Sequence, residues 1–141
     1  MRALGVDFGE KRVGIAMGDP TGAIATPWGI LNRHSNRQVA EQVAGLVPAH
    51  DIEIVVVGLP LDSSGEEGYQ ARRVRRFGDI LESLLSVPLV YWDETLSSVD
   101  ADRALRQAGR RKKRRQGPKD DVAAAILLQA YLDTRLSSEK P

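Results

Sequence analysis

The sequence contains no cysteine among its 141 residues. Disulfide bonds, thiolate metal sites and cysteine nucleophiles are therefore excluded. The same absence fits a reducing compartment, so we expect a cytoplasmic protein. No apolar stretch approaches the roughly 20 residues that cross a membrane, which excludes a membrane-spanning helix. Met1 and Arg2 lead directly into a short strand-like segment rather than into the long apolar region of a secretory signal.

The sequence also has few histidines and almost no net charge. The two histidines, His34 and His50, flank a predicted helix in polar surroundings that are typical of ordinary surface residues. No histidine is placed to activate Ser97 or Ser98, so this serine pair fits a helix cap better than a nucleophile. The formal net charge of +1 predicts no partner by itself.

The distribution of charge is more informative than its sum. Six basic residues are consecutive: Arg110, Arg111, Lys112, Lys113, Arg114 and Arg115. Such a run is either a solvated, flexible loop or an arm that binds a phosphate backbone in a salt-dependent way. The run alone does not choose between these two interpretations.

The first half of the chain predicts a hairpin, a further strand and a helix. Strands over 2–8 and 12–17 are joined by a short turn. A third short strand is expected around 27–31, where Pro27 indicates a strand start or a sheet edge. A helix is then expected after Ser35 or Asn36, ending before Pro48.

The second half predicts alternating strands and helices. The expected elements are strands over 52–58 and 87–92, and helices over 66–85, from Ser97 or Ser98 to about 109, and over 121–134. Together these elements predict an α/β fold with a mixed five-stranded sheet, three antiparallel strands followed by two parallel ones, flanked by helices. We expect a single domain over 1–136 and a frayed tail over 137–141.

Acidic residues stand at the ends of the predicted core elements. Asp7 ends the first strand, Asp93 and Glu94 end the last strand, and Asp120 and Asp121 open the last helix. Ligands of open α/β sheets gather at the carboxyl ends of strands. Three carboxylates ~5 Å apart would repel by about 3 kcal/mol per pair at an effective dielectric of ~20. A bound divalent cation would remove this conflict, and oxygen ligands favour Mg²⁺ or Mn²⁺ over zinc.

Each acidic pair also has a simpler interpretation. Asp93 and Glu94 could merely end a strand, and Asp120 or Asp121 could cap the last helix. Asp120 lies on one helical stripe with Ala124, Leu127, Leu128 and Tyr131, whereas Asp121 lies on another with Ala125, Leu128 and Leu132. The spacing does not decide which of the two belongs to a shared site.

Four motifs follow one another along the chain: Asp7-Phe8-Gly9-x-Lys11-Arg12-x-Gly14, Val57-Gly58-Leu59-Pro60, Asp93-Glu94-Thr95-Leu96-Ser97-Ser98, and Asp120-x-x-Ala123-Ala124-x-x-Leu127-Leu128-Gln129-x-Tyr131-Leu132. In this order they resemble the motifs of the YqgF (RuvX) family. The resemblance implies a ribonuclease H-like fold, in which the first strand is central. It also implies a metal-dependent nuclease that matures the 5′ end of the 16S ribosomal RNA precursor. An older label of the family is Holliday-junction resolvase, acting on branched DNA.

Carried over position by position, the acidic site of the family falls on Asp7, Glu94 and Asp120, with Asp121 in a variable slot. The family often has arginine after the Asp-Glu pair, where this chain has Thr95. That departure leaves the acids intact but leaves open any contact of that arginine with the nucleic-acid backbone, for which the nearby basic run could substitute.

We therefore expect phosphodiester hydrolysis with metal ions held by the three acids. Lys11 and Arg12, on the turn after Asp7, are candidates for holding the scissile or an adjacent phosphate. The 110–115 run and the arginines at 72–76 would follow the nucleic-acid backbone without specifying sequence. Either precursor rRNA or branched DNA would satisfy these contacts, since both present the same phosphates.

Two other hypotheses compete with a nuclease. Asp-x-Gly in a hairpin also resembles the phosphate loop of actin-like ATPases and sugar kinases, but those proteins need a second, similar half that 141 residues do not accommodate. A non-catalytic RNA-binding factor of ribosome assembly would keep the same fold and the same acids. Metal-dependent cleavage by the purified protein separates that hypothesis from an enzyme.

Overall fold

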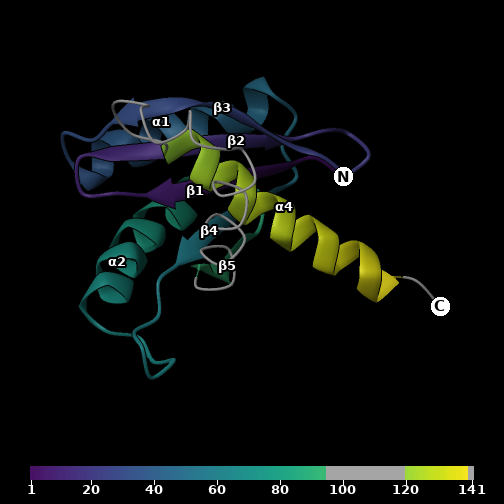
Figure 1. Ribbon diagram of the computed structural model, residues 1–141. Coiled ribbons are helices and arrows are strands. Elements are labelled where there is room, and N and C mark those ends of the chain that lie inside the picture. Colours follow the sequence, from purple (N-terminus) through teal and green to yellow (C-terminus); the bar gives the residue numbers. More distant parts are fainter. Residues whose placement is uncertain (95–119, 140–141) are drawn as a thin grey trace, which may run out of the picture.

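A five-stranded mixed sheet forms the centre of the computed structural model, which describes residues 1–94 and 120–139 (Figure 1). The strands are β1 (Ala3–Phe8), β2 (Arg12–Gly18), β3 (Ala25–Asn32), β4 (Ile54–Leu59) and β5 (Leu89–Asp93). Their order across the sheet is β3-β2-β1-β4-β5. The first three strands pair antiparallel, whereas β4 pairs parallel with both β1 and β5. The predicted sheet, with the first strand at its centre, is confirmed.

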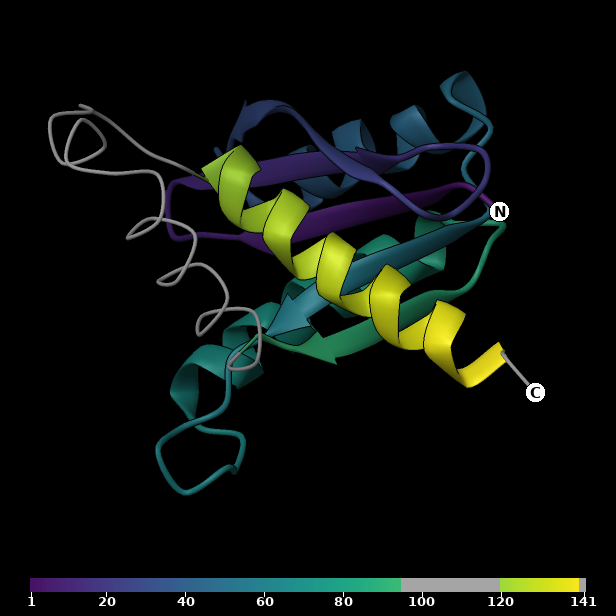
Figure 2. The same ribbon diagram turned by 45° about the vertical axis from the view of Figure 1, so that its right-hand side comes forward.

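Helices cover both faces of this sheet. They are α1 (Asn36–Ala49), α2 (Tyr69–Leu84) and α4 (Asp120–Glu139). α1 and α2 lie on one face, and α4 runs diagonally across the other (Figure 2). Within the described residues, no helix combines the length and apolarity that a bilayer span requires. The helix expected between Ser97 and about 109 lies outside the described part of the chain.

The alternation of side chains along the strands produces two hydrophobic cores. Leu4, Val6 and Phe8 of β1 pack with α1 and α2, whereas Ala3 faces α4. Successive residues of a strand point to opposite faces, so a strand that is covered on both sides has no polar face. β4, with sequence IVVVGL, is buried along its whole length, as its β-branched run predicts. A polar residue at the end of such a strand therefore sits at the boundary between core and solvent.

Two element boundaries in the first half differ from expectation. β3 begins at Ala25, ahead of Pro27, and it lies at the edge of the sheet, so of the two alternatives that Pro27 indicates the sheet edge is confirmed. The pairing of β2 with β3 shifts between Ile15 and Ala16, so that Pro27 and Gly29 are paired and Trp28 is the additional residue of a bulge. α1 continues through Pro48 to Ala49, so that the proline lies in the last turn of the helix, where it donates no backbone hydrogen bond.

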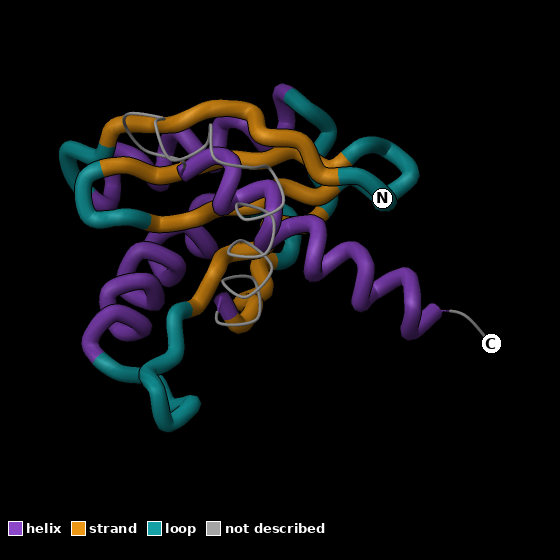
Figure 3. The backbone as a smooth tube through the Cα atoms, in the orientation of Figure 1, coloured by secondary structure: helices purple, strands orange, loops and turns teal. Residues whose placement is uncertain are grey.

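Two boundaries in the second half also differ. α2 begins at Tyr69 rather than at 66, because the Asp62 side chain accepts the backbone N–H groups of Ser64 (2.9 Å) and Glu66 (3.0 Å) and holds a separate turn. α4 continues to Glu139, so the predicted tail is helical at least as far as that residue. These differences concern only the ends of elements. The order of the described helices and strands along the chain matches the prediction (Figure 3).

Candidate active site

Asp7 lies near the carboxyl end of the central strand, between glycines of the two neighbouring strands. It pairs with Gly14 of β2, and the parallel register of β1 with β4 brings Gly58 to its other side. A Cβ atom at Gly14 would lie 2.0 Å from the carbonyl oxygen of Asp120. A Cβ atom at Gly58 would lie 3.5 Å from Oε1 of Glu94. The two glycines therefore leave the space in which the other two acids approach Asp7.

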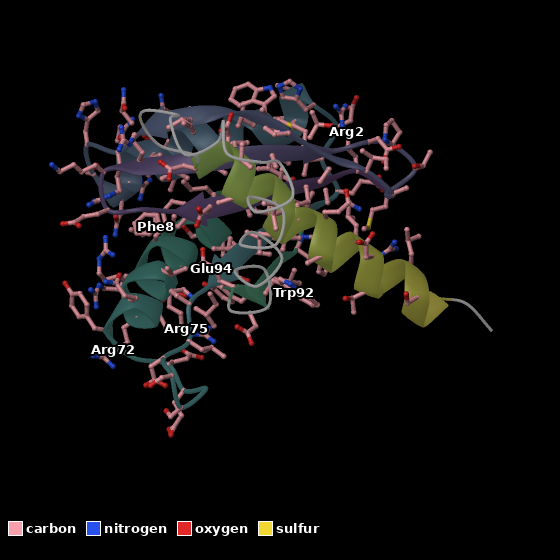
Figure 4. The ribbon with its side chains drawn as sticks, in the orientation of Figure 1. Arg2, Phe8, Arg72, Arg75, Trp92 and Glu94 are labelled. Atoms are coloured by element: carbon pink, nitrogen blue, oxygen red, sulfur yellow. The ribbon has the colours of Figure 1, made fainter. Side chains whose placement is uncertain are left out.

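Glu94 and Asp120 meet Asp7 in this space. The side chains of Asp7 and Glu94 are joined by a hydrogen bond, and Figure 4 shows Glu94 beside the carboxyl end of β1. Burial, the hydrogen bond to Glu94 and the negative charges of Glu94 and Asp120, in that order of size, together raise the pKa of Asp7 from 3.8 to about 8. Asp7 therefore tends to keep its proton at neutral pH. Of the two candidates on α4, it is Asp120 whose charge acts on Asp7.

A basic turn borders the acids on the α4 side. Nε of Arg12 lies 3.6 Å from Oδ2 of Asp120, and the Arg12 side chain is 48% exposed. Lys11 is exposed beside it. Both residues line a pocket of about 270 Å³ with Gly9, Glu10 and Asp120. The pocket combines exposed cations with the acidic site, an arrangement suited to a phosphate group that approaches the carboxylates.

The donor chemistry of this cluster fits Mg²⁺ or Mn²⁺. Asp7, Glu94 and Asp120 offer only oxygen atoms, and their mutual repulsion is what a divalent cation would neutralise. As the side chains stand, no three acidic or histidine side chains within residues 1–94 and 120–139 are arranged to hold a metal ion. The ion pair with Arg12 engages Asp120, while Asp7 and Glu94 are already in contact.

The two predicted second acids, Asp93 and Asp121, are not among the groups that raise the pKa of Asp7, which are Glu94 and Asp120. Asp93 pairs with Leu59 in the β4–β5 ladder, and Asp121 follows Asp120 in the first turn of α4. The Arg110–Arg115 run and Thr95 lie outside the described residues.

Arg33 belongs to this site although no sequence motif points to it. Its Nε donates to the carbonyl oxygen of Glu10 at 2.7 Å, and its Nη2 donates to the same oxygen. Its backbone N–H donates to the carbonyl of Lys11 at 2.8 Å. Arg33 therefore fastens the turn that carries Lys11 and Arg12. The 23 residues that separate Arg33 from Glu10 leave no local sequence signal for this contact.

Comparison with known proteins identifies the family of this chain. The family model RuvX, described as Holliday junction resolvase, matches residues 1–134. The chain belongs to the RuvX family. A relative from Syntrophus aciditrophicus is 41% identical over 140 residues, covering 99% of this chain and 93% of its own length. A relative from Chloroflexus aurantiacus is 43% identical over 135 residues, covering 96% of this chain and 88% of its own. Both are named "Putative pre-16S rRNA nuclease".

Solved structures agree with the fold of this RuvX chain. RuvC of Thermus thermophilus in complex with a Holliday junction substrate superposes with a TM-score of 0.66 at 14% identity, covering 100% of this chain and 99% of the other. The fowlpox virus Holliday junction resolvase superposes with a TM-score of 0.56 at 12% identity, covering 95% and 99%. The ribonuclease H-like fold, predicted from the four motifs, is confirmed.

Proposed function

We propose that this chain is a metal-dependent nuclease that hydrolyses phosphodiester bonds in the 5′ region of the 16S rRNA precursor. The observation that carries the proposal is the meeting of Asp7, Glu94 and Asp120 at the carboxyl end of the central strand. These acids come from three elements far apart in the sequence. Burying them together is unfavourable unless a ligand compensates their charge. The names of the 41–43% identical relatives support RNA as the substrate.

The three acids are the groups that would hold Mg²⁺ or Mn²⁺. A bound divalent cation supplies Lewis acidity and neutralises charge on the phosphate during phosphodiester hydrolysis. To hold it, Asp7 would release its proton, and Asp120 would exchange its contact with Arg12 for one with the cation. Of the three acids, Asp7 has the least conformational freedom of its backbone, because it lies within the central strand.

Lys11 and Arg12 supply the complementary charge. Both are exposed in the pocket that includes Asp120, so a phosphate can reach them without a rearrangement of the core. Arg12, freed from Asp120 when that carboxylate binds a cation, is available to a phosphate oxygen. Arg33 holds this turn in place through the Glu10 and Lys11 carbonyls. A fixed turn orients the phosphate relative to the acids, which is the main contribution a protein makes to phosphoryl chemistry.

The test is cleavage of a 5′-extended 16S rRNA precursor fragment by the purified protein and by Asp7→Asn, each in Mg²⁺ and in Mn²⁺. Asp7→Asn removes one anionic ligand while its amide can still donate a hydrogen bond to Glu94, so we expect at least a 100-fold loss of cleavage. RNA binding in EDTA should change little. Asp133→Asn, on the exposed side of α4, is the matched control and should cleave like the wild type.

A four-way DNA junction is included in the same assay because the matching family model is described as Holliday junction resolvase. Preferential cleavage of the junction would replace RNA by branched DNA as the substrate. Equal cleavage by wild type and Asp7→Asn would reject the assignment of the acids. Tight RNA binding with no cleavage in either metal would identify a non-catalytic RNA-binding factor.

A further inference from the structure

The arginines of α2 form one basic stretch in the sequence, but the structure gives them different partners. Arg75 already has partners within the protein. Its Nε and Nη2 donate to the two carboxylate oxygens of Glu67 at 2.6 and 2.7 Å, and its guanidinium lies 4.6 Å from the centre of the Tyr91 ring. Arg73 has no such anchor. Its guanidinium carbon lies 5.6 Å from the centre of the Phe8 ring, and Nη1 donates to Gln70 at 2.6 Å.

Phe8 is the point where Arg73 comes close to the candidate active site. It follows Asp7 directly and is only 8% exposed. Its ring stacks on Phe77 of α2 with centroids 4.4 Å apart. Arg33 also lies over this ring, 5.5 Å from its centre. Because successive residues of a strand face opposite sides, Asp7 faces α4 while Phe8 and the two arginines lie on the α2 side of the same strand end.

Among the described residues, neither arginine has an ion pair with a carboxylate within 4.0 Å, unlike Arg12, Arg37 and Arg75. Two half-buried guanidinium groups over one ring place two positive charges close together. A phosphate is the ligand that planar guanidinium groups bind best, through paired N–H donors. Arg33 is occupied with the Glu10 carbonyl, whereas Arg73 has four of its five N–H donors without a partner among the described residues.

We propose that Arg73 binds a phosphate of the substrate strand on the α2 side of the acids, with Arg33 adding positive charge and holding the turn. This inference rests on the proposed function and adds a path for the nucleic acid. The strand crosses the carboxyl end of β1, with one phosphate at Lys11 and Arg12 and a neighbouring phosphate at Arg73. The acids lie between these two positions, so the bond that is cut is held from both sides.

The test is the salt dependence of RNA binding by wild type and Arg73→Met, measured by anisotropy of a short fluorescein-labelled single-stranded RNA in EDTA. Methionine keeps an apolar side chain over Phe8 but removes the charge. Each phosphate contact contributes about 0.7 to the slope of log Kd against log salt for a single strand, so we expect Arg73→Met to lower the slope by about 0.7. Arg73→Lys retains the charge and should keep nearly the wild-type slope.

Arg37→Met is the matched control, because Arg37 is an exposed arginine of α1 paired with Glu41 at 3.2 Å. It removes the same charge and should leave the slope unchanged. An unchanged slope in Arg73→Met, or an equal loss in Arg73→Met and Arg73→Lys, would overturn the inference. If the wild type cleaves RNA while Arg73→Met binds normally, only this inference fails. If the wild type neither binds nor cleaves RNA, the proposed function fails and the inference falls with it.

Discussion

Asp7 links the proposed chemistry to stability. Its pKa is 3.8 in an ordinary environment and about 8 in the folded protein, because burial and its acidic neighbours disfavour the charge. At pH values between these two, the folded protein keeps a proton that the unfolded chain has released. The contribution of Asp7 to the free energy of unfolding is therefore fully present below pH 3.8 and is lost as the pH rises towards 8. At neutral pH this residue makes the protein less stable than it could be.

We expect Asp7→Asn to become more stable than the wild type as the pH rises from about 4 to 8 in the absence of divalent cations. The asparagine side chain carries no charge at any of these pH values, and its amide can still donate to Glu94. The gain reaches on the order of 5 kcal/mol as an upper limit, from 1.36 kcal/mol per pKa unit. Urea unfolding of both proteins in EDTA across this range measures it. Parallel stability profiles of wild type and variant would contradict the raised pKa.

The contact of α4 with the sheet determines where the third acid lies. α4 begins at Asp120, directly over Gly14 of β2, where a methyl group would overlap the Asp120 carbonyl. Further along the helix, Gly5 of β1 approaches Ala124 and Leu128 in the same way. The helix thus packs backbone to backbone on the two strands that carry Asp7 and the basic turn. Its first turn cannot move away without separating Asp120 from Asp7.

Gly14→Ala should consequently impair catalysis more than stability. The Cβ atom, 2.0 Å from one backbone atom and 2.9 Å from the backbone nitrogen of Asp121, forces the first turn of α4 outward. Overpacking of this kind costs about 1–3 kcal/mol, while cleavage should fall at least tenfold. Gly29→Ala in the adjacent strand β3, where no atom lies within 4 Å of the added Cβ, is the control and should retain activity. Urea unfolding measures the loss of stability, and the precursor-RNA assay measures the loss of cleavage. If Gly14→Ala cleaves RNA as fast as the wild type, the packing argument is refuted.

The sequence alone predicts the order of the described elements and the acidic residues at their ends. The β-branched run of β4 and the apolar stripe of α4 are local patterns, and local patterns determine the type of an element well. The start of α2 was misplaced because Asp62 binds backbone groups of its own loop, a contact that hydrophobic periodicity does not record. The choice between Asp120 and Asp121 depends on which of them faces β1. That orientation follows from the Gly14 contact, which joins residues more than a hundred positions apart and has no local signature.

Across the whole molecule, charge is separated although its sum is only +1. The acids converge at one end of the central strand, and the basic groups stand around them: Lys11 and Arg12 on the α4 side, Arg33 and Arg73 on the α2 side. A polyanion would be attracted to this rim and repelled by its centre unless a cation occupies the centre. Under the proposed function, a metal ion and a nucleic acid would bind at the same place, each favouring the other. Binding of the cation should consequently stabilise the whole fold.

Addition of Mg²⁺ should raise the thermal midpoint of the wild type, because a ligand that binds only the folded protein stabilises it by mass action. The stabilisation approaches about 2.7 kcal/mol at a Mg²⁺ concentration of one hundred times Kd. It should grow as the pH rises to about 8, because Asp7 loses its proton and protons then compete less with the cation for its carboxylate. Differential scanning calorimetry of wild type, Asp7→Asn and Asp133→Asn in increasing Mg²⁺ provides the measurement. Asp133→Asn should respond like the wild type and Asp7→Asn should not; equal responses of all three would mean that the ion binds elsewhere and that the acids at the end of β1 are not its ligands.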